Sequence, residues 1–326
     1  MDQETITKPV DRVSIIPIDN KYRAIWENYQ LQQKSVWLAS SIYTTTDYKT
    51  YPTLPTDIQL SLKYILGFFA GSDEIVNQNL VDRFLQEITI PEIRYNYAHQ
   101  AMMENVHSET YGMLIDGILP DGEKKMCFNA IRTLNSVKRK ADWATRWISS
   151  DKPFSHRCIA FACVEGIMFS ASFAFIDWMK SAGYVMEGLY QSNDYISRDE
   201  ASHNKSSYIV YSYIDNRVPQ DIVKEIIDEA ISAELLYAKE VLPNNYNGMN
   251  YNMMSQHIRH VANITATSLG YDNIYGNTSS PFTFSNIRSV DTKPNFFEVH
   301  NTQYNTCSDY GAPFDTTNVN WDSDSE

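Results

Sequence analysis

Cysteine is scarce in this chain of 326 residues, which contains only four. None of the four forms a C-x-x-C pair, and four cysteines in a chain of this length do not make a disulfide framework. The first residues, Met1-Asp2-Gln3-Glu4, are polar and lack the apolar stretch of a signal peptide. We therefore expect a protein of a reducing compartment, the cytoplasm.

Positive charge is also in short supply. Lys and Arg number 27 against 40 Asp and Glu, which gives a net charge of -13 and a pI near 5.0. A nucleic-acid partner requires a basic stripe. The only short basic cluster, Lys138-Arg139-Lys140, lies in a mixed-charge helical segment, where it predicts a solvated face. We expect no nucleic-acid partner.

Long apolar runs are limited to one, from Cys158 to Ile176, whose length would suit a membrane span. This run carries Glu165 near its centre together with several serines, and no second run accompanies it. We interpret it as a helix buried on all sides within a protein that has no membrane partner.

Neither a Gly/Ser linker nor a break in composition divides the chain, and 43% of its residues are hydrophobic, enough for one large core. Alternating strand patterns are few, so we expect an all-α fold. We divide the chain into an irregular segment 1–19, a helical domain 20–270 and a flexible, polar segment 271–326. A loop is expected from Tyr43 to Pro55. The helices predicted from apolar periodicity are Lys21–Trp37, Thr56–Ile88, one that begins at Pro91, Glu123–Ser149, Phe154–Ala182, Met186–Ile214, Gln220–Leu242 and Asn250–Leu269.

Two E-x-x-H motifs organise the chain. On a helix of 3.6 residues per turn, Glu104, His107 and Tyr111 share one face. The second motif, Glu200 and His203, lies within another helical segment. One such motif is a near-chance event in a chain with 7 His, but two on separate helices indicate a site for two metal ions.

Two further carboxylates stand in apolar surroundings. Glu165 is the only charged residue of the apolar run Cys158–Ile176, and Asp73 follows the apolar stretch that ends at Ser72. A helical bundle with a two-metal carboxylate site takes an E-x-x-H pair from each of two helices and one carboxylate from each of two others. Two divalent cations would neutralise four carboxylates, and oxygen ligands with two imidazoles suit iron or manganese better than zinc.

The alternative for these residues is structural. Asp73 and Glu165 would cap loops or pair with Arg83 or Arg157, and the two E-x-x-H motifs would be accidental. Because the four sites fall on four helices in the correct order, we regard accident as the weaker hypothesis.

Six stretches carry a resemblance to a known family: FFAGSD at 68–73, MENVHSETY at 103–111, ADWA at 141–144, VEGIMFS at 164–170, ISRDE at 196–200 with His203, and NFFE at 295–298. From about Trp26 to Tyr304, the chain resembles the small, radical-generating subunit of class I ribonucleotide reductase, most closely the eukaryotic type. The resemblance implies a ferritin-like bundle with additional helices around two iron ions per chain, iron being preferred to manganese. The implied ligands are Asp73, Glu104 and His107 for one iron and Glu165, Glu200 and His203 for the other, with Glu104 and Glu200 as candidate bridges.

The resemblance also implies an activity. In that family, oxygen reacts with the metal site, and an electron and a proton are then taken from a tyrosine that Tyr111 matches. A buried radical needs an apolar wall against quenching. Phe169 and Phe173, four and eight residues after Glu165, would supply that wall.

Radical transfer to a partner subunit needs a route. Trp37 matches the family's tryptophan, and Asp199 matches the aspartate that links it to the metal-bound His107. A ligand histidine usually donates its second N–H to a carboxylate or carbonyl, which gives Asp199 a physical task. Tyr304 matches the tail tyrosine that passes the radical across the subunit interface, and Tyr310 lies at similar range.

The resemblance finally implies the partners. The protein would be a homodimer that reduces ribonucleotides to deoxyribonucleotides together with a separately encoded large subunit, with Phe314 and Trp321 as candidate docking residues. One alternative is a stand-alone ferritin-like di-iron oxidase, which would need no exit route for a radical. Another is a catalytically silent scaffold, against which the complete set of six ligands and the tyrosine speaks.

Overall fold

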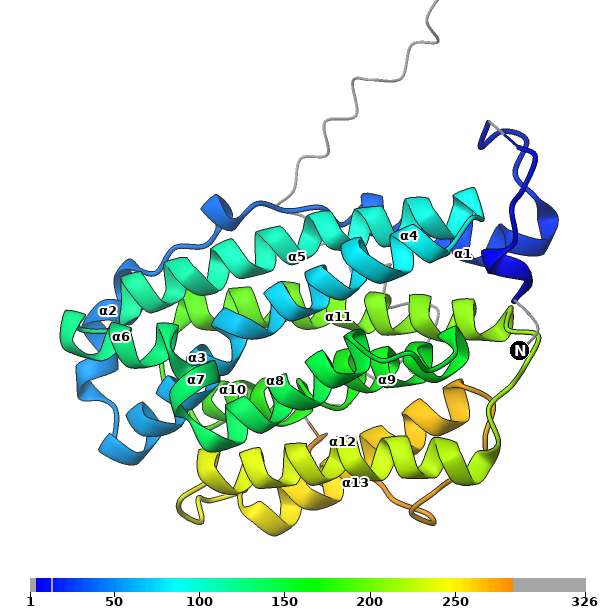
Figure 1. Ribbon diagram of the computed structural model, residues 1–326. Helices are drawn as coiled ribbons and strands as arrows, with labels where there is room; N and C mark the ends of the chain where they lie inside the picture. Colours follow the sequence, from blue (N-terminus) through cyan, green and yellow to red (C-terminus); the bar gives the residue numbers. More distant parts are fainter. Residues whose placement is uncertain (1–3, 13, 284–326) are drawn as a thin grey trace, which may run out of the picture. The chain divides into compact units, whose positions relative to one another are not determined.

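The computed structural model describes residues 4–12 and 14–283 of the chain. Long helices lie alongside one another in this part (Figure 1), and the described residues contain no β-strand, only an isolated bridge between Tyr246 and Met249. The predicted all-α class is confirmed. The α-helices are α1 (Arg23–Gln33), α2 (Thr45–Thr50), α3 (Thr56–Asn79), α4 (Leu85–Glu87), α5 (Pro91–Ile118), α6 (Asp121–Phe128), α7 (Ala130–Thr133), α8 (Asn135–Ile148), α9 (Phe154–Gly166), α10 (Ser170–Ser181), α11 (Glu187–Ser212), α12 (Gln220–Val241) and α13 (Tyr251–Ser268).

Four helices, α3, α5, α9 and α11, form the centre of the bundle. α3 packs against α5, and α11 packs against both α9 and α5, while α12 covers α8, α9 and α13 (Figure 1). The buried face of α3 includes Ile58, Leu62, Ile65, Phe69 and Asp73, which recur every three or four residues. Since this is the period of a helix, the carboxylate ends up on the same face as the apolar residues before it.

The single helix expected over Glu123–Ser149 is wrong, because three helices, α6, α7 and α8, occupy this region. Leu134 interrupts the helix with an extended backbone (φ -98°, ψ 114°). α6 and α7 pack across α3, where Gly67 allows a close approach. A Cβ on Gly67 would lie only 2.6 Å from the Cβ of Ala130. Tertiary packing therefore overrides the local preference for one continuous helix.

The helix expected over Phe154–Ala182 is also broken. Residues 167–169 separate α9 from α10, and the amides of Ile167 and Met168 both donate to the carbonyl oxygen of Cys163 (2.9 and 3.1 Å). In the described part of the chain, this is the one stretch long and apolar enough to cross a membrane, yet 94% of its most apolar window is buried inside the protein. The run is therefore part of the bundle core.

The segment from Tyr43 to Pro55, expected as a loop, contains the short helix α2 and is anchored to α11. Asp47 is fully buried and accepts hydrogen bonds from the amides of Gly188 and Leu189 (3.1 and 2.7 Å) at the start of α11. A carboxylate at a helix N-terminus satisfies free N–H groups and matches their partial positive charge. A Cβ on Gly188 would lie 2.5 Å from the carbonyl oxygen of Tyr43, so this contact requires glycine.

Candidate metal centre

The six residues predicted as metal ligands lie together between the four central helices. Each of them is at most 3% exposed. They come from four separate elements, and the E-x-x-H pairs each place a carboxylate and an imidazole one turn apart on the inner face of a helix. The contributors are Asp73 of α3, Glu104 and His107 of α5, Glu165 of α9, and Glu200 and His203 of α11.

The ligand atoms of these residues form two groups, in each of which all atoms lie within 4.8 Å of one another. The groups are Asp73, Glu104 and His107, and Glu104, Glu165, Glu200 and His203. Glu104 belongs to both groups, as a bridging carboxylate would. Glu200 also faces the first group, because its Oε1 lies 3.0 Å from Nδ1 of His107.

Six polar atoms of the cluster are buried without a hydrogen-bond partner among the described residues: Asp73 Oδ2, His107 Nδ1, Glu165 Oε2, Glu200 Oε1 and Oε2, and His203 Nδ1. Leaving one buried polar atom unsatisfied costs about 1–3 kcal/mol, so six at one place call for a shared ligand. The histidine nitrogens approach the glutamate oxygens at 3.0 to 3.5 Å without hydrogen-bond geometry. Atoms that converge on a common metal ion have this arrangement.

Electrostatics also favour cations at this place. Burial raises the pKa of Asp73 well above its usual value, and the charge of Glu104 adds to this effect. Burial and the charge of Glu200 do the same to the pKa of Glu165. Burial alone would lower the pKa of His203, but the two neighbouring glutamates outweigh it and raise this pKa to about 10. Two divalent cations would neutralise the four carboxylates and displace these protons, so the donor set fits two metal ions.

One form of the structural alternative pairs Asp73 and Glu165 with Arg83 or Arg157. Arg83 and Arg157 are instead engaged with Glu87, whose two carboxylate oxygens each contact one guanidinium group. Both arginines therefore lie in a separate ion-pair cluster, and the buried carboxylates keep their inward orientation.

Gln100 is a further residue of the site that the motifs do not predict. Its Nε2 donates to Oε1 of Glu165 (2.9 Å) and to Oε1 of Glu104 (3.2 Å) and so orients both carboxylates. The signal that could have found it is its position four residues before Glu104 on the same helix face. Ser72 does the same for Asp73, whose Oδ1 accepts from the serine hydroxyl (3.1 Å).

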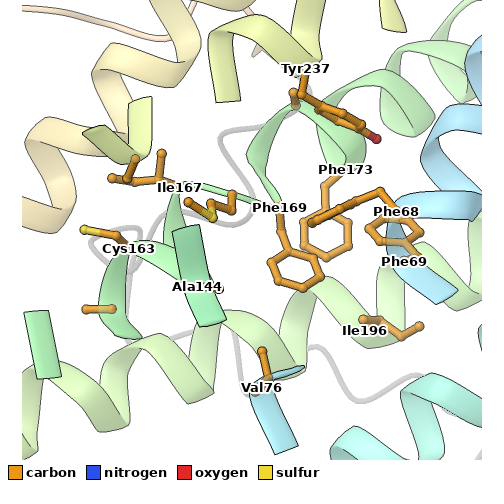
Figure 2. Close-up of a cluster of buried hydrophobic side chains, with 14 of the residues drawn as sticks. Phe68, Phe69, Val76, Ala144, Cys163, Ile167, Phe169, Phe173, Ile196 and Tyr237 are labelled. Carbon is orange, nitrogen blue, oxygen red and sulfur yellow. The ribbon is translucent and has the colours of Figure 1, made fainter. Parts of the chain in front are cut away.

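Tyr111 lies one turn beyond the histidine of α5 and is 1% exposed. Its ring stacks on Phe69 at 4.4 Å with an interplanar angle of 14°. Phe169 and Phe173 pack on Phe69 with ring centroids at 6.0 and 5.5 Å, and Figure 2 shows these three phenylalanines together. The aromatic wall thus includes Phe69 in addition to the two predicted phenylalanines. Burial, with the charge of Asp73, raises the pKa of the Tyr111 phenol well above its usual value, so the phenol stays protonated.

Trp37 lies after the end of α1, which stops at Gln33 instead of continuing to Trp37 as expected. Its indole Nε1 donates to Oδ2 of Asp199 (2.7 Å), and the same oxygen lies 3.2 Å from Nε2 of His107. Burial would raise the pKa of Asp199, but the contact with His107 lowers it overall and keeps the carboxylate ionised. The structure thus brings together Trp37, Asp199 and His107 of the predicted relay. Tyr304 and Tyr310 lie outside the described residues.

A cavity of about 130 Å³ borders the cluster on the side of α13. Glu165 and Glu200 line one part of it, and His257 and His260 line another. Nδ1 of His257 lies 3.0 Å from the hydroxyl of Ser280, and His260 faces a backbone carbonyl after α13. This volume is well above the roughly 10–15 Å³ that one water molecule needs, so the cavity has room for a small reactant beside the carboxylates.

The helical bundle and its buried cluster define a ferritin-like protein with a two-metal carboxylate site. Residues 13–281 match the family model described as ribonucleotide reductase, small chain. The chain therefore belongs to the ribonucleotide reductase small chain family.

Known relatives cover most of the chain. A ribonucleoside-diphosphate reductase small chain of Trypanosoma brucei brucei is 42% identical over 93% of this chain and 90% of its own length. A second one, from Spisula solidissima, is 41% identical over 90% of this chain and 76% of its own. Among solved structures, the ribonucleotide reductase Rnr4 homodimer from Saccharomyces cerevisiae matches with a TM-score of 0.78 at 30% identity, covering 86% of this chain and 88% of that one.

Proposed function

We propose that this chain is the radical-generating small subunit of a ribonucleoside-diphosphate reductase and acts with a separately encoded large subunit. The observation that carries the proposal is the placement of Tyr111, a buried phenol one helical turn from a histidine of the metal cluster and stacked on Phe69. The names of the relatives support the substrate class, ribonucleoside diphosphates. A tyrosine so enclosed can hold an unpaired electron away from solvent and reductants.

The metal would be iron, two ions per chain, in preference to manganese. When bound and exposed to oxygen, such a site supplies the oxidising power for a one-electron step. The cavity beside Glu165 and Glu200 gives a small reactant access to the carboxylates. Tyr111 would give up one electron and its phenolic proton, both of which the reduction of oxygen consumes, and Phe69, with the phenylalanines behind it, would exclude water from the radical that remains. The six ligands would be Asp73, Glu104, His107, Glu165, Glu200 and His203.

Metal analysis tests the donor set directly. Protein reconstituted with ferrous iron and oxygen is expected to contain close to two irons per chain, because the cluster offers two overlapping groups of ligand atoms. Glu165→Ala should lower this occupancy, whereas Glu229→Ala, which removes a half-exposed carboxylate of α12, should leave it unchanged. One zinc per chain in place of two irons, or full occupancy in Glu165→Ala, would contradict the proposed site.

Delivery of the radical would use the contacts from His107 through Asp199 to Trp37 and then the tail residue Tyr304. A stand-alone oxidase would have no use for such a route. The homodimeric state of the yeast structure supports a homodimer here as well. The cytoplasmic location remains a prediction from the sequence.

Tyr304→Phe separates radical storage from radical delivery. The change removes the phenolic O–H, and with it a proton-coupled redox step, while leaving side-chain bulk almost the same. We expect a normal radical on Tyr111 and normal binding to the large subunit, with nucleotide reduction abolished. Tyr310→Phe is the matched control and should retain turnover. If the two variants show the opposite pattern, Tyr310 is the relay.

Deletion of residues 311–326 should instead weaken subunit binding, because Phe314 and Trp321 are the candidate anchors.

A further inference from the structure

A buried ion pair joins α8 to α12 outside the metal centre. Nζ of Lys140 lies 2.7 Å from Oε2 of Glu234, and the two side chains are 1% and 0% exposed. The solvated face expected for the basic cluster 138–140 is therefore wrong for Lys140, whereas the side chain of Lys138 is 50% exposed. An ion pair removed from water is tolerated only when its remaining hydrogen-bonding atoms also find partners.

Those partners are found at the break between α9 and α10. The ammonium group of Lys140 donates to the carbonyl oxygen of Met168, and Oε1 of Glu234 accepts from the amide of Ala171 at 3.0 Å. Because residues 167–169 interrupt the helix, carbonyl groups at the end of α9 and amides at the start of α10 lack helical partners. A cation at the first terminus and an anion at the second match the partial charges of both.

The same ion pair is linked to the aromatic wall of the metal centre through Phe68. Nζ of Lys140 lies 3.3 Å from the ring centroid of Phe68 and 3.8 Å from that of Tyr237. Phe68 packs on Phe169 at 5.2 Å, and Phe169 packs on Phe69, the residue stacked on the buried tyrosine. Figure 2 shows Phe68, Phe69, Phe169 and Tyr237 within one cluster. A shift of the ion pair would therefore reach the wall within two side-chain contacts.

We propose that Lys140 and Glu234 are positioning residues that hold the α9–α10 break and thereby set where Glu165 and Phe169 lie. Glu165 precedes Met168 by one helical turn, and Phe169 follows it directly, so both move with the carbonyl that Lys140 holds. Loss of the ion pair would loosen the backbone at the break and shorten the lifetime of the Tyr111 radical. The second effect rests on the proposed function, whereas the first does not.

Hydrogen exchange on the full-length, metal-free protein measures the backbone effect. Lys140→Met/Glu234→Leu removes both charges together, so no buried charge is left alone. Amides of residues 167–173 should exchange about tenfold faster or more, the factor for one lost hydrogen bond, while those of α5 keep their rates. After reconstitution with iron and oxygen, the tyrosyl signal should decay faster by a comparable factor. Unchanged exchange at 167–173 in this folded variant would overturn the proposal.

Three further variants separate positioning from bulk stability. Glu234→Gln keeps an acceptor for Ala171 and should retain its slow exchange, whereas Glu234→Leu should not. If the double variant fails to fold, Glu234→Gln decides the matter by itself, because fast exchange at Ala171 in this variant would overturn the proposal. The exchanged pair Lys140→Glu/Glu234→Lys restores opposite charges but can neither donate to Met168 nor accept from Ala171, so it should behave like the double variant. Wild-type exchange in the exchanged pair would show that only charge matters and would overturn the proposal.

Lys138→Met removes an exposed lysine of the same helix and should change neither exchange nor radical decay. Effects of this control equal to those of the double variant would overturn the proposal. If wild-type protein forms no tyrosyl radical, the proposed function fails, and the exchange rates still decide whether the ion pair holds the break.

Discussion

Tyr111→Phe is expected to bind two irons and consume oxygen like the wild-type protein, but to form no stable tyrosyl radical and to support no measurable nucleotide reduction. Loss of a residue on which the chemistry depends lowers turnover on the order of a thousandfold or more. The substitution is mild for the fold, because the ring can keep its stacking on Phe69. The Tyr111 hydroxyl has no hydrogen-bond partner among the described residues, so its removal leaves no new unsatisfied group.

Electron paramagnetic resonance after addition of ferrous iron and oxygen measures this prediction, with metal content and thermal unfolding measured in parallel. Tyr97→Phe is the matched control, since Tyr97 is also fully buried on α5. It should keep the radical. A tyrosyl signal of the same shape in Tyr111→Phe would place the radical elsewhere and refute the assignment.

Trp37→Phe is expected to leave the Tyr111 radical in place and to lower nucleotide reduction on the order of a thousandfold or more, as expected for a residue on which the chemistry depends. The indole N–H is the only atom that joins this ring to Asp199 by a hydrogen bond, at 2.7 Å, and phenylalanine cannot replace it. Loss of a hydrogen bond to a charged group also destabilises a protein by about 1.5–3 kcal/mol. The stability effect must therefore be separated from the effect on delivery.

Trp143→Phe provides that separation. Trp143 is 7% exposed, and its indole N–H donates to a carboxylate oxygen of Glu229 at 2.9 Å, between α8 and α12. This control should lose stability of the same order while retaining turnover with the large subunit. Equal turnover in the two variants would show that Trp37 is only a packing residue. A missing radical in Trp37→Phe would assign the residue to radical formation instead of delivery.

The sequence by itself predicted the residues that the structure brings together in the buried cluster. Glu104 and His107 share a helix face because their spacing is one turn, and this is a local property that needs no knowledge of other helices. Asp73 and Glu165 were found because an unpaired carboxylate in apolar surroundings is unfavourable and calls for a cation. The position of Tyr111 on this face followed from the same helical period, whereas its role as the radical tyrosine came from the family resemblance. Apart from that role, all of these inferences depend on neighbours along the chain or on the solvation of one side chain.

Only the tertiary structure decided what meets across helices. Lys140 belongs to a basic cluster that predicts a solvated face, yet its position on α8 points it at Glu234 of α12, 94 residues along the chain. The break at residues 167–169 could likewise not be predicted from the sequence, where residues 158–176 form one unbroken apolar run. The groups that hydrogen-bond to this break come from α8 and α12. Periodicity tells which face of a helix is buried, but the partner of a buried charge depends on which helices pack together, and long-range packing sets that.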